Sequence, residues 1–256
     1  MMQRRNFLVA AGAAFLTGCT EIGKTDWFGK IAQGAQNWHR GLHRALGGGR
    51  IPMAPEYDRS AISSYFRGNG NLTVDSDAYR EALAAGFPDW RLTVSGLVDT
   101  PLSLSLEDIR ALPQRTQVTR HDCVEGWSAI GEWTGPQLAQ ILDMAGVQEG
   151  ARFAVFRCAD FTMRGPADNR RRVDYYESCD MDDAMHPQTI VAHMLNGEAL
   201  PERNGAPLRM RLERQLGYKQ PKYLTGIELV ASLDGINGGQ GGYWEDVAGY
   251  QWYAGI

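Results

Sequence analysis

The chain has 256 residues, of which 43% are hydrophobic and 22% are charged, and its formal net charge is −4. This length and apolar content are enough for one sizeable folded core. The weakly acidic balance gives no indication of nucleic-acid binding, which calls for a strongly basic surface. We therefore expect a globular domain that binds no nucleic acid.

The N-terminus carries the pattern of an export signal. The run Arg4–Leu8, with its two arginines, precedes a short apolar stretch to Leu16, which predicts a twin-arginine signal too short to span a bilayer. It ends in Leu16-Thr17-Gly18-Cys19, which resembles a bacterial lipobox. We expect residues 1–18 to be the signal peptide, the twin-arginine export machinery to be a partner, and a lipidated Cys19 to tether a periplasmic protein to a membrane. An ordinary cleaved signal is the alternative.

An N-terminal arm is expected over residues 19–50. Apolar residues recur at helical spacing within it, and three glycines at 47–49 end the pattern, which predicts an amphipathic helix. These apolar residues are Trp27, Ile31, Ala35, Trp38, Leu42 and Ala45. His39 and His43 lie four residues apart on this helix and could hold a heme, but two histidines on a polar face are the favoured interpretation.

Residues 51–235 show no interdomain linker and no internal repeat, so we expect one α+β domain. Helices are predicted from Asp75 or Ser76 to near Gly86, from Ser105 onward, and over 136–145 before Gly146. Strands are predicted over 90–94, 116–120, 152–158, 208–212 and 223–231.

Cys123 is the most informative residue, because it is a lone thiol at the end of a predicted strand. The four cysteines are far apart, at positions 19, 123, 158 and 179, so no Cys-x-x-Cys pair supports a dithiol cycle or a zinc site. A single thiol can be a buried core residue, a nucleophile or a metal ligand. The residue taken alone leaves these three roles open.

Several motifs accompany Cys123 in a fixed order. They are Cys123–Ser128, Gly131–Gly135, Tyr175–Ser178, Asp183–Pro187, Asn196–Pro201, Asn204–Arg209 and Gly217–Leu224. Together they resemble the molybdopterin domain of the sulfite oxidase family over residues 60–231. The resemblance implies the α+β sulfite-oxidase-type fold, with mixed sheets and surrounding helices. It also implies an oxidoreductase that uses molybdenum held by molybdopterin.

The resemblance makes Cys123 the protein ligand of the molybdenum. A thiolate suits a metal already bound by the dithiolene sulfurs of the pterin, because soft sulfur donors leave other positions free for oxygen-atom transfer. The alternatives are a structural thiol and a cysteine nucleophile assisted by His121.

The resemblance also assigns the cofactor contacts. The family holds the pterin phosphate with basic side chains and backbone N–H groups, and Arg209 and Lys222 occupy the matching positions. Asn204 matches a pterin contact, and Gln220–Pro221 lies where backbone contacts occur. Cys158 stands where a relative has a contacting threonine, although a core thiol is equally expected.

Two arginines that follow Arg209 are expected to face solvent rather than the cofactor. Arg211 and Arg214 are expected on a solvated strand face, because side chains alternate along a strand.

Two further segments are expected near the metal. Tyr175 aligns with a tyrosine whose phenol can hydrogen-bond a substrate oxygen, and Tyr176 is the alternative occupant. The run Ser63–Asn69 resembles the first cofactor-binding segment of the family, with Ser63 and Phe66 as contacts and Arg67 as an anion-binding residue. A surface arginine is the alternative for Arg67.

The sequence departs from the sulfite oxidases directly after Cys123. Those enzymes have an Asn-Arg-Arg run that helps neutralise sulfite, whereas this chain has Glu125-Gly126-Trp127. A carboxylate there would oppose a small dianion. The run Val124–Ser128 more closely resembles the catalytic subunit of the protein-methionine-sulfoxide reductases. The arginine-rich run 164–172 is expected to be a solvated loop, with a basic rim for an anion or a redox partner as the alternative.

The sequence shows no heme-attachment motif, no iron–sulfur spacing and no Rossmann glycine pattern, so we expect no heme, flavin or iron–sulfur cluster in this chain. Electrons would then be exchanged with a separate protein, a cytochrome or a membrane heme subunit. The glycine- and aromatic-rich tail at 236–256 is expected to pack back over the domain, with partner docking as the alternative.

Taken together, the sequence predicts an exported molybdenum-molybdopterin oxidoreductase that transfers an oxygen atom on a small sulfur- or nitrogen-centred substrate of sulfite or sulfoxide type. A lipid-anchored scaffold that kept the fold without the chemistry is one rival. A thiol enzyme centred on Cys123 is the other.

Overall fold

The computed structural model describes residues 34, 35, 38, 40–42, 45 and 52–256, in two units that comprise residues 1–50 and 51–256. In the first unit the described residues are helical, as expected for that segment. The signal peptide, the lipobox with Cys19, and both His39 and His43 lie outside the described residues. Within the described part of the chain, no helix is long and apolar enough to cross a membrane.

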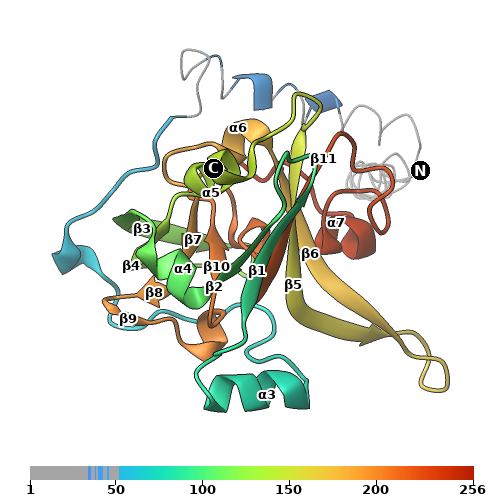
Figure 1. Ribbon diagram of the computed structural model, residues 1–256, viewed down its shortest axis with the longest axis horizontal. Helices are drawn as coiled ribbons and strands as arrows, with labels where there is room; N and C mark the ends of the chain where they lie inside the picture. Colours follow the sequence, from blue (N-terminus) through green and yellow to red (C-terminus); the bar gives the residue numbers. More distant parts are fainter. Residues whose placement is uncertain (1–33, 36–37, 39, 43–44, 46–51) are drawn as a thin grey trace, which may run out of the picture. The chain divides into compact units, whose positions relative to one another are not determined.

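The second unit is built around a five-stranded sheet in the order β2-β1-β11-β5-β6 (Figure 1). Its strands are β1 (Arg91–Gly96), β2 (Leu102–Ser105), β5 (Phe153–Arg164), β6 (Arg171–Asp180) and β11 (Leu224–Val230). β1 and β11 pair in parallel and the other neighbours are antiparallel, so the sheet is mixed. Leu92 and Val94 alternate with exposed residues along β1, which is the period of a strand with one buried face.

A second sheet carries the strand that ends at Cys123. Its order is β3-β4-β8-β9, with β3 (Gln114–Cys123), β4 (Trp127–Pro136), β8 (Met194–Leu195) and β9 (Glu198–Ala199). β3 and β4 form one continuous hairpin from the pair Gln114 and Pro136 to the pair Cys123 and Trp127. Gly126 closes its turn at a φ of 85°, which favours glycine, and donates its N–H to the Cys123 carbonyl at 3.0 Å. The turn therefore fixes Cys123 at the end of a rigid ladder.

A short two-stranded sheet joins β7 (Ile190–Ala192) to β10 (Arg209–Arg211). The short helical elements are η1 (Arg59–Ala61), α6 (Met181–Ala184), η2 (Glu202–Asn204), η3 (Gly217–Lys219) and α7 (Tyr243–Ala248).

Capping residues predict an end of each of three helices. α3 (Asp77–Ala84) is capped by Ser76, and α4 (Leu106–Ala111) has a capping box made by Ser105 and Asp108. α5 (Leu138–Ala145) ends at Gly146, whose φ of 70° places it in the left-handed region. These capped ends are confirmed, because the capping signals are local. The predicted start of the third helix at residue 136 is wrong, because Pro136 still pairs with Gln114 in β4.

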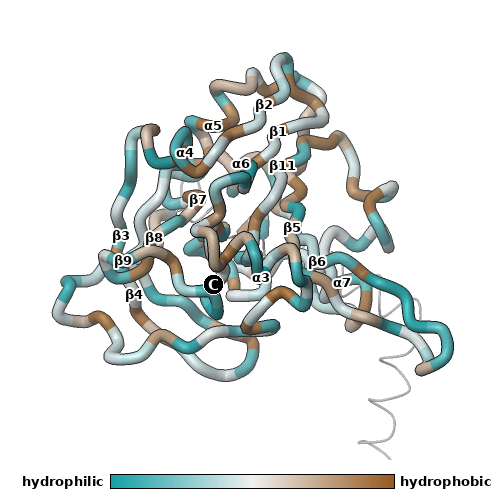
Figure 2. Tube along the Cα trace, turned by 60° about the horizontal axis from the view of Figure 1, so that its bottom comes forward, coloured by the Kyte–Doolittle hydropathy of each residue, from teal (hydrophilic) through white to brown (hydrophobic). Residues whose placement is uncertain are grey.

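The largest hydrophobic cluster lies between the five-stranded sheet and helices α3, α4 and α5, and a smaller one surrounds the fully buried Trp133 of β4. Figure 2 shows the corresponding alternation of apolar and polar positions along the chain trace. The mixed sheets with peripheral helices agree with the predicted α+β class.

The outer parts of β5 and β6 extend past the rest of the sheet as a long hairpin (Figure 1). After a register shift between Arg157 and Phe161, four pairs run from Phe161 opposite Asp174 to Arg164 opposite Arg171. The run 164–172 was expected to be a loop, which is wrong at its two ends because the strand pairing continues into it. It is largely exposed, as expected.

The C-terminal tail folds back onto the domain, as the sequence predicted. Leu216 donates its N–H to the Ala254 carbonyl at 3.0 Å, and the Ile256 N–H reaches the Arg214 carbonyl at 3.0 Å. The tail also supplies α7, which packs beside β6 (Figure 1).

Candidate active site

A cavity of about 350 Å³ lies where the β3–β4 turn, the β5–β6 hairpin and the tail meet. It is lined by Asn69–Asn71, Cys123–Glu125, Asp160, Thr162, Arg164, Tyr175, Tyr218, Gln220–Lys222, Tyr243, Trp244 and Tyr250. Five of the predicted site residues are in this set: Cys123, Tyr175, Gln220, Pro221 and Lys222. We call it the Cys123 cavity.

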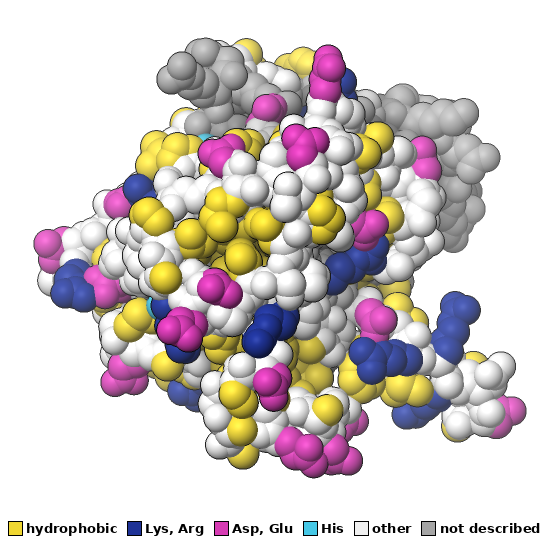
Figure 3. All heavy atoms as spheres, in the orientation of Figure 1, with side chains coloured by type: hydrophobic (Ala, Val, Ile, Leu, Met, Phe, Trp, Pro, Cys, Tyr) yellow, Lys and Arg dark blue, Asp and Glu magenta, His cyan; other side chains and the backbone are white. Residues whose placement is uncertain are grey.

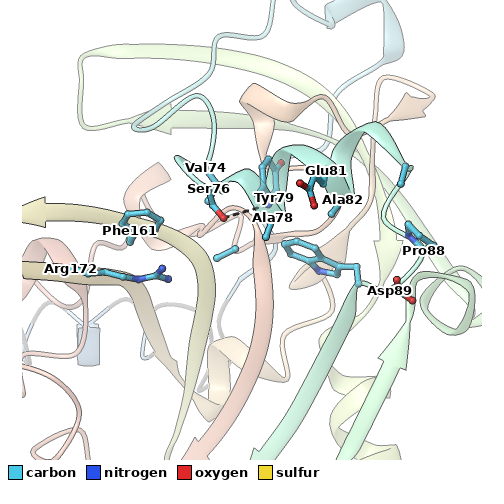
Figure 4. Close-up of a pocket in the computed structure, with 13 residues that line it drawn as sticks. Val74, Ser76, Ala78, Tyr79, Glu81, Ala82, Pro88, Asp89, Phe161 and Arg172 are labelled. Atoms are coloured by element: carbon cyan, nitrogen blue, oxygen red, sulfur yellow. Dashed lines mark hydrogen bonds between the residues drawn. The ribbon is translucent and has the colours of Figure 1, made fainter.

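A larger hollow of about 570 Å³ runs along α3 (Figure 4). Its walls include Tyr79, Trp90, Phe161 and Arg172, and none of the predicted site residues lines it. The Cys123 cavity is therefore the better candidate for the active site, although it is the smaller of the two.

The Cys123 side chain is 8% exposed and faces the cavity from the end of β3. Burial raises the pKa of its thiol, so the bare protein holds it protonated. Such a thiol is a poor free nucleophile, whereas a bound metal ion deprotonates a thiol outright.

His121 does not activate this thiol. It is fully buried, and burial followed by the nearby charge of Arg211 lowers its pKa well below the usual value. Its Nδ1 lies 2.9 Å from a guanidinium nitrogen of Arg211, and no hydrogen bond to Cys123 occurs. The thiolate–imidazolium pair of a cysteine nucleophile is therefore not formed.

Two buried cations next to the cavity have no carboxylate partner among the residues that the structure describes. Arg209 is 0% exposed and donates to the carbonyls of Asn204, at 3.0 Å, and Gln220, at 3.1 Å. Lys222 is 6% exposed and donates to the carbonyls of Asn71 and Arg203. Burial, with a neighbouring cation, lowers the pKa of Arg209 to about 9 and that of Lys222 to about 7.

Buried charge without a counterion is costly, and a protein retains it where a ligand supplies the opposite charge. The Arg209 and Lys222 pair therefore fits an anionic ligand. A cavity of this size, with a soft thiol on its wall and uncompensated cations behind it, can enclose a small anionic cofactor.

Comparison with known proteins assigns the family. Residues 81–234 match the family described as the oxidoreductase molybdopterin-binding domain. This chain belongs to that family.

Among its relatives is a putative protein-methionine-sulfoxide reductase subunit YedZ1 of Azospira oryzae, 41% identical over 203 residues, which cover 79% of this chain and 68% of the relative. The protein-methionine-sulfoxide reductase catalytic subunits MsrP of Xanthomonas campestris pv. campestris and Campylobacter jejuni are 32% and 34% identical over 164 and 144 residues. These alignments cover 63% and 55% of this chain and 51% and 48% of the relatives, so the match spans about half of the MsrP length.

The sulfane dehydrogenase SoxCD of Paracoccus pantotrophus shares the fold, with a TM-score of 0.50 at 23% identity over 57% of this chain and 39% of that one. The chain is therefore a molybdopterin-binding oxidoreductase with the sulfite-oxidase-type α+β fold, as the sequence predicted.

The residues present fit molybdopterin. Its phosphate requires cations that lack another anion, and Arg209 and Lys222 meet this requirement. The Gln220 side chain is fixed by the carbonyls of Leu212 and Gln215, and its own Oε1 is buried without a hydrogen-bond partner in the described structure.

Of the two adjacent tyrosines, Tyr175 lines the cavity. Its hydroxyl donates to the Tyr218 carbonyl at 2.9 Å, and burial raises its pKa, so it remains a protonated phenol. The hydroxyl of Tyr176 donates to Asp246 on α7 at 2.5 Å, so this side chain is held elsewhere. The two point apart because successive strand residues face opposite sides.

The structure places other predicted contacts outside the cavity lining. The Ser63 hydroxyl accepts the Ile130 N–H at 2.9 Å, and Phe66 packs edge-on against Trp133 at 5.0 Å. Arg67 is exposed, with its guanidinium carbon 5.9 Å from the Trp127 ring. In this segment it is Asn69–Asn71 that borders the cavity. Cofactor roles for Ser63, Phe66 and Arg67 stay predictions.

Asn204 and Cys158 lie behind the cavity rather than on its wall. Asn204 is buried and its carbonyl positions Arg209. Cys158 is buried opposite Leu224 of β11, and burial raises the pKa of its thiol. Cys158 therefore has the environment of a core thiol. Its contact with a cofactor stays a prediction.

The expectation of a solvated face for Arg211 is wrong. Arg211 is 0% exposed and forms a two-point ion pair with Glu213, at 2.5 and 3.0 Å. Its guanidinium lies 4.3 Å from the Trp133 ring, and that of Arg209 lies 5.0 Å from the same ring. Alternation failed here because both faces of β10 are covered. Arg214 is half-buried.

Sequence reasoning missed the remaining cavity residues. They are Asp160, Thr162 and Arg164 of β5, Tyr218 of η3, and Tyr243, Trp244 and Tyr250 of the tail. The aromatic richness of the tail was the available signal, but its packing partner was not encoded locally. Asp160 accepts from Asn71 at 2.8 Å, which joins two of the walls.

Proposed function

We propose that this chain is an exported molybdenum-molybdopterin oxidoreductase that transfers an oxygen atom on a small sulfur-centred substrate, with reduction of an organic sulfoxide as its reaction. The observation that carries the proposal is the pair of buried, uncompensated cations, Arg209 and Lys222, beside a cavity walled by a single thiol. Nitrogen-centred oxides are a less favoured substrate class.

Cys123 would be the protein ligand of the molybdenum, and Arg209 and Lys222 would hold the pterin phosphate. When bound, the cofactor would supply a two-electron centre that accepts an oxygen atom. The overall reaction consumes two electrons and two protons for each sulfoxide and releases the thioether and water.

The cavity lining favours a sulfoxide over sulfite. Tyr175, Tyr218, Tyr243, Trp244 and Tyr250 present aromatic rings, which pack well against sulfur and its neighbouring methyl or methylene groups.

The carboxylates of Glu125 and Asp160 also border the cavity, and a sulfite dianion would be repelled by both. Glu125 is held in place by the Trp127 Nε1, which donates to it at 3.0 Å. The relatives named as methionine-sulfoxide reductases support the same choice.

Within the cavity, the Tyr175 phenol is the group placed to donate a hydrogen bond to a substrate oxygen once it leaves the Tyr218 carbonyl. Its raised pKa keeps the proton available across the neutral range. Tyr175 would thus orient the sulfoxide oxygen, while the aromatic wall orients the substrate carbons.

The proposal includes export through the twin-arginine pathway, lipid attachment at Cys19, a periplasmic location, and electron delivery by a separate cytochrome or membrane heme subunit. The sequence of residues 4–19 and the missing heme and iron–sulfur motifs support these points. Fractionation of cells expressing the full chain tests them, because a Cys19→Ala variant should move from the membrane to the soluble periplasmic fraction.

The thiol-enzyme and scaffold hypotheses have less support. The raised pKa of Cys123 and the absence of a His121 contact disfavour a thiol enzyme. A scaffold would have no use for uncompensated buried cations, which cost stability.

The deciding experiment is molybdenum and pterin analysis of protein from a cofactor-competent host, together with viologen-driven reduction of dimethyl sulfoxide. Wild type should contain near-stoichiometric metal and pterin. Cys123→Ala should lose the metal or alter its spectrum, and should lose roughly 10- to 100-fold or more in rate.

The matched control is Cys179→Ala, because Cys179 is a buried thiol in the hydrophobic core. Equal metal content and rate in Cys123→Ala and wild type would contradict the assignment of Cys123. A folded wild type with neither metal nor pterin would refute the function.

A further inference from the structure

The outer part of the β5–β6 hairpin forms a projecting arm. We call residues 161–174 the basic arm. Its four strand pairs run from Phe161 and Asp174 to Arg164 and Arg171, beyond the register shift that separates it from the rest of the sheet. Figure 1 shows it extending past the domain, and Figure 3 shows Lys and Arg side chains on the projecting lobe.

The basic arm differs in charge from the rest of the chain. It holds four arginines, at 164, 170, 171 and 172, and two aspartates, at 168 and 174, which give it a net charge of +2. Since the whole chain carries −4, the remainder carries −6. A basic projection on an acidic body creates a directional field that attracts acidic partners to one place.

Three of the four arginines of the basic arm have no carboxylate partner among the described residues. Only Arg172 has a carboxylate partner, Asp174, at 2.5 Å, and it also covers the Phe161 ring at 4.0 Å. Arg170 and Arg171 have no ion pair within the described residues. Arg171 lies directly across the strand pair from Arg164, an arrangement of like charges that destabilises a hairpin. An anionic partner on that face would relieve the repulsion.

The basic arm is joined to the Cys123 cavity. Thr162 and Arg164 line that cavity, and Arg164 donates to the Tyr243 hydroxyl at 2.8 Å. The opposite face of the same strands, with Phe161 and Arg172, borders the hollow along α3 (Figure 4). Cross-strand partners share a face, so Arg171 stands on the same side as Arg164 and the cavity.

We propose that the basic arm, through Arg170 and Arg171, docks an acidic electron-transfer protein at the mouth of the Cys123 cavity. This rests on the proposed function, which requires electrons from a separate protein. A small, charged and exposed contact is typical of transient redox complexes, in which electrostatics set the association rate.

A protein surface fits the arm better than a lipid surface. The turn at 165–169 contains Asp168 and Asn169 and has no aromatic residue to enter a bilayer.

The test compares two charge-reversal variants of the cofactor-loaded protein. The arm variant is Arg170→Glu with Arg171→Glu, and it leaves the cavity residue Arg164 in place. The matched control is Arg91→Glu with Arg110→Glu, which makes the same change in net charge at exposed positions outside the arm and the Cys123 cavity. The probe is a plant-type [2Fe–2S] ferredoxin, used as an acidic one-electron donor.

Two readouts separate docking from catalysis. Calorimetric titration with ferredoxin at about 0.01 M salt, where charges act over about 30 Å, measures docking directly. Dimethyl sulfoxide reduction is then driven either by reduced ferredoxin or by reduced methyl viologen, which needs no docking site.

We expect the arm variant to bind ferredoxin at least about tenfold more weakly than wild type, and to lose about the same factor in ferredoxin-driven rate, while its viologen-driven rate is unchanged. The control variant should behave as wild type. Equal ferredoxin binding by the arm and control variants would overturn the proposal.

Arm-dependent sedimentation with phosphatidylglycerol vesicles, without a change in ferredoxin binding, would overturn it in favour of a membrane role. If no variant reduces dimethyl sulfoxide with viologen but binding still depends on the arm, the docking site stands and the proposed function fails.

Discussion

Four buried cations lie within fourteen residues of each other in the sequence, and they fall into two kinds. Arg211 is paired with Glu213, and Lys219 with Glu177 and Glu245, each at 2.6 Å. Among the described residues, Arg209 and Lys222 donate only to backbone carbonyls. Arg211 and Lys219 are neutralised by carboxylates, whereas Arg209 and Lys222 have no carboxylate partner within the described residues.

Burial of a charge therefore does not by itself mark a functional residue. A buried ion pair is part of the structure, and removing one partner leaves an uncompensated charge in the interior. A buried cation without a counterion is already in that costly state, so its removal relieves the bare protein and harms only ligand binding. Stability and cofactor content should therefore respond in opposite ways at the two kinds of site.

The largest effect is expected for Lys219→Met. This change leaves Glu177 and Glu245 buried together without their common cation, so the free energy of unfolding should fall by about 3 to 5 kcal/mol. Urea unfolding of the apoprotein measures it. Adding Glu177→Gln and Glu245→Gln should recover part of the loss. A fall of less than about 1 kcal/mol for Lys219→Met would show that this buried ion pair is not needed for stability.

Lys222→Met is expected to lower the cofactor content while leaving the apoprotein stable. The apoprotein should lose less than about 1 kcal/mol or gain stability, because a desolvated charge is removed. Molybdopterin content should fall by roughly 10- to 100-fold, as expected when a hydrogen bond to a charged group is lost. The fluorescence of the extracted pterin measures the molybdopterin content, and urea unfolding of the apoprotein measures its stability. A variant that retains its pterin would remove Lys222 from the phosphate site.

The pH dependence of stability should also reveal the buried charge of Lys222. Burial lowers the pKa of Lys222 to about 7 from 10.5, so between these values the unfolded chain binds a proton that the folded chain does not. Stability of the apoprotein should therefore rise with pH through this window, and the Lys222→Met variant should lack this contribution. The difference between the two unfolding profiles isolates Lys222 from the tyrosines and cysteines that titrate nearby. A difference in unfolding free energy between wild type and Lys222→Met that does not change with pH would contradict the lowered pKa of Lys222.

The smallest effect is expected for Asp160→Asn. The carboxylate of Asp160 raises the pKa of Lys222 without an ion pair, so it offsets part of the positive charge at the site. Its removal should tighten binding of inorganic phosphate to the apoprotein by about 1.5- to 5-fold, the range for one weakly coupled charge. Titration calorimetry provides the measurement, with Asp143→Asn on α5 as a control. Weaker binding in Asp160→Asn would show that Asp160 positions the ligand.

The fold could be predicted largely because its signals are local. The Ser76 and Ser105 caps, the glycine that ends α5 and the alternation in β1 each depend on a few neighbouring residues. The motifs around Cys123, Tyr175 and Lys222 identified one part of the cavity for the same reason.

The rest of the site depends on contacts between distant segments. The sequence indicated that the tail would pack on the domain but not that Tyr243 and Trp244 would close the cavity. Arg211 was misassigned because strand alternation assumes one solvated face, and both faces of β10 are covered. The projection of the basic arm was not predicted, since strand pairing between β5 and β6 sets it.

The position of the aromatic wall has a consequence for the order of synthesis. Cys123, Tyr175 and Lys222 emerge from the ribosome well before residues 243–250, which form the remaining wall of the cavity. A ligand therefore cannot be enclosed while the chain ends at Lys222, even though most of its contacts already exist. If the proposed cofactor binds in the Cys123 cavity, this wall can close over it only after residues 243–250 have been made and α7 has packed beside β6.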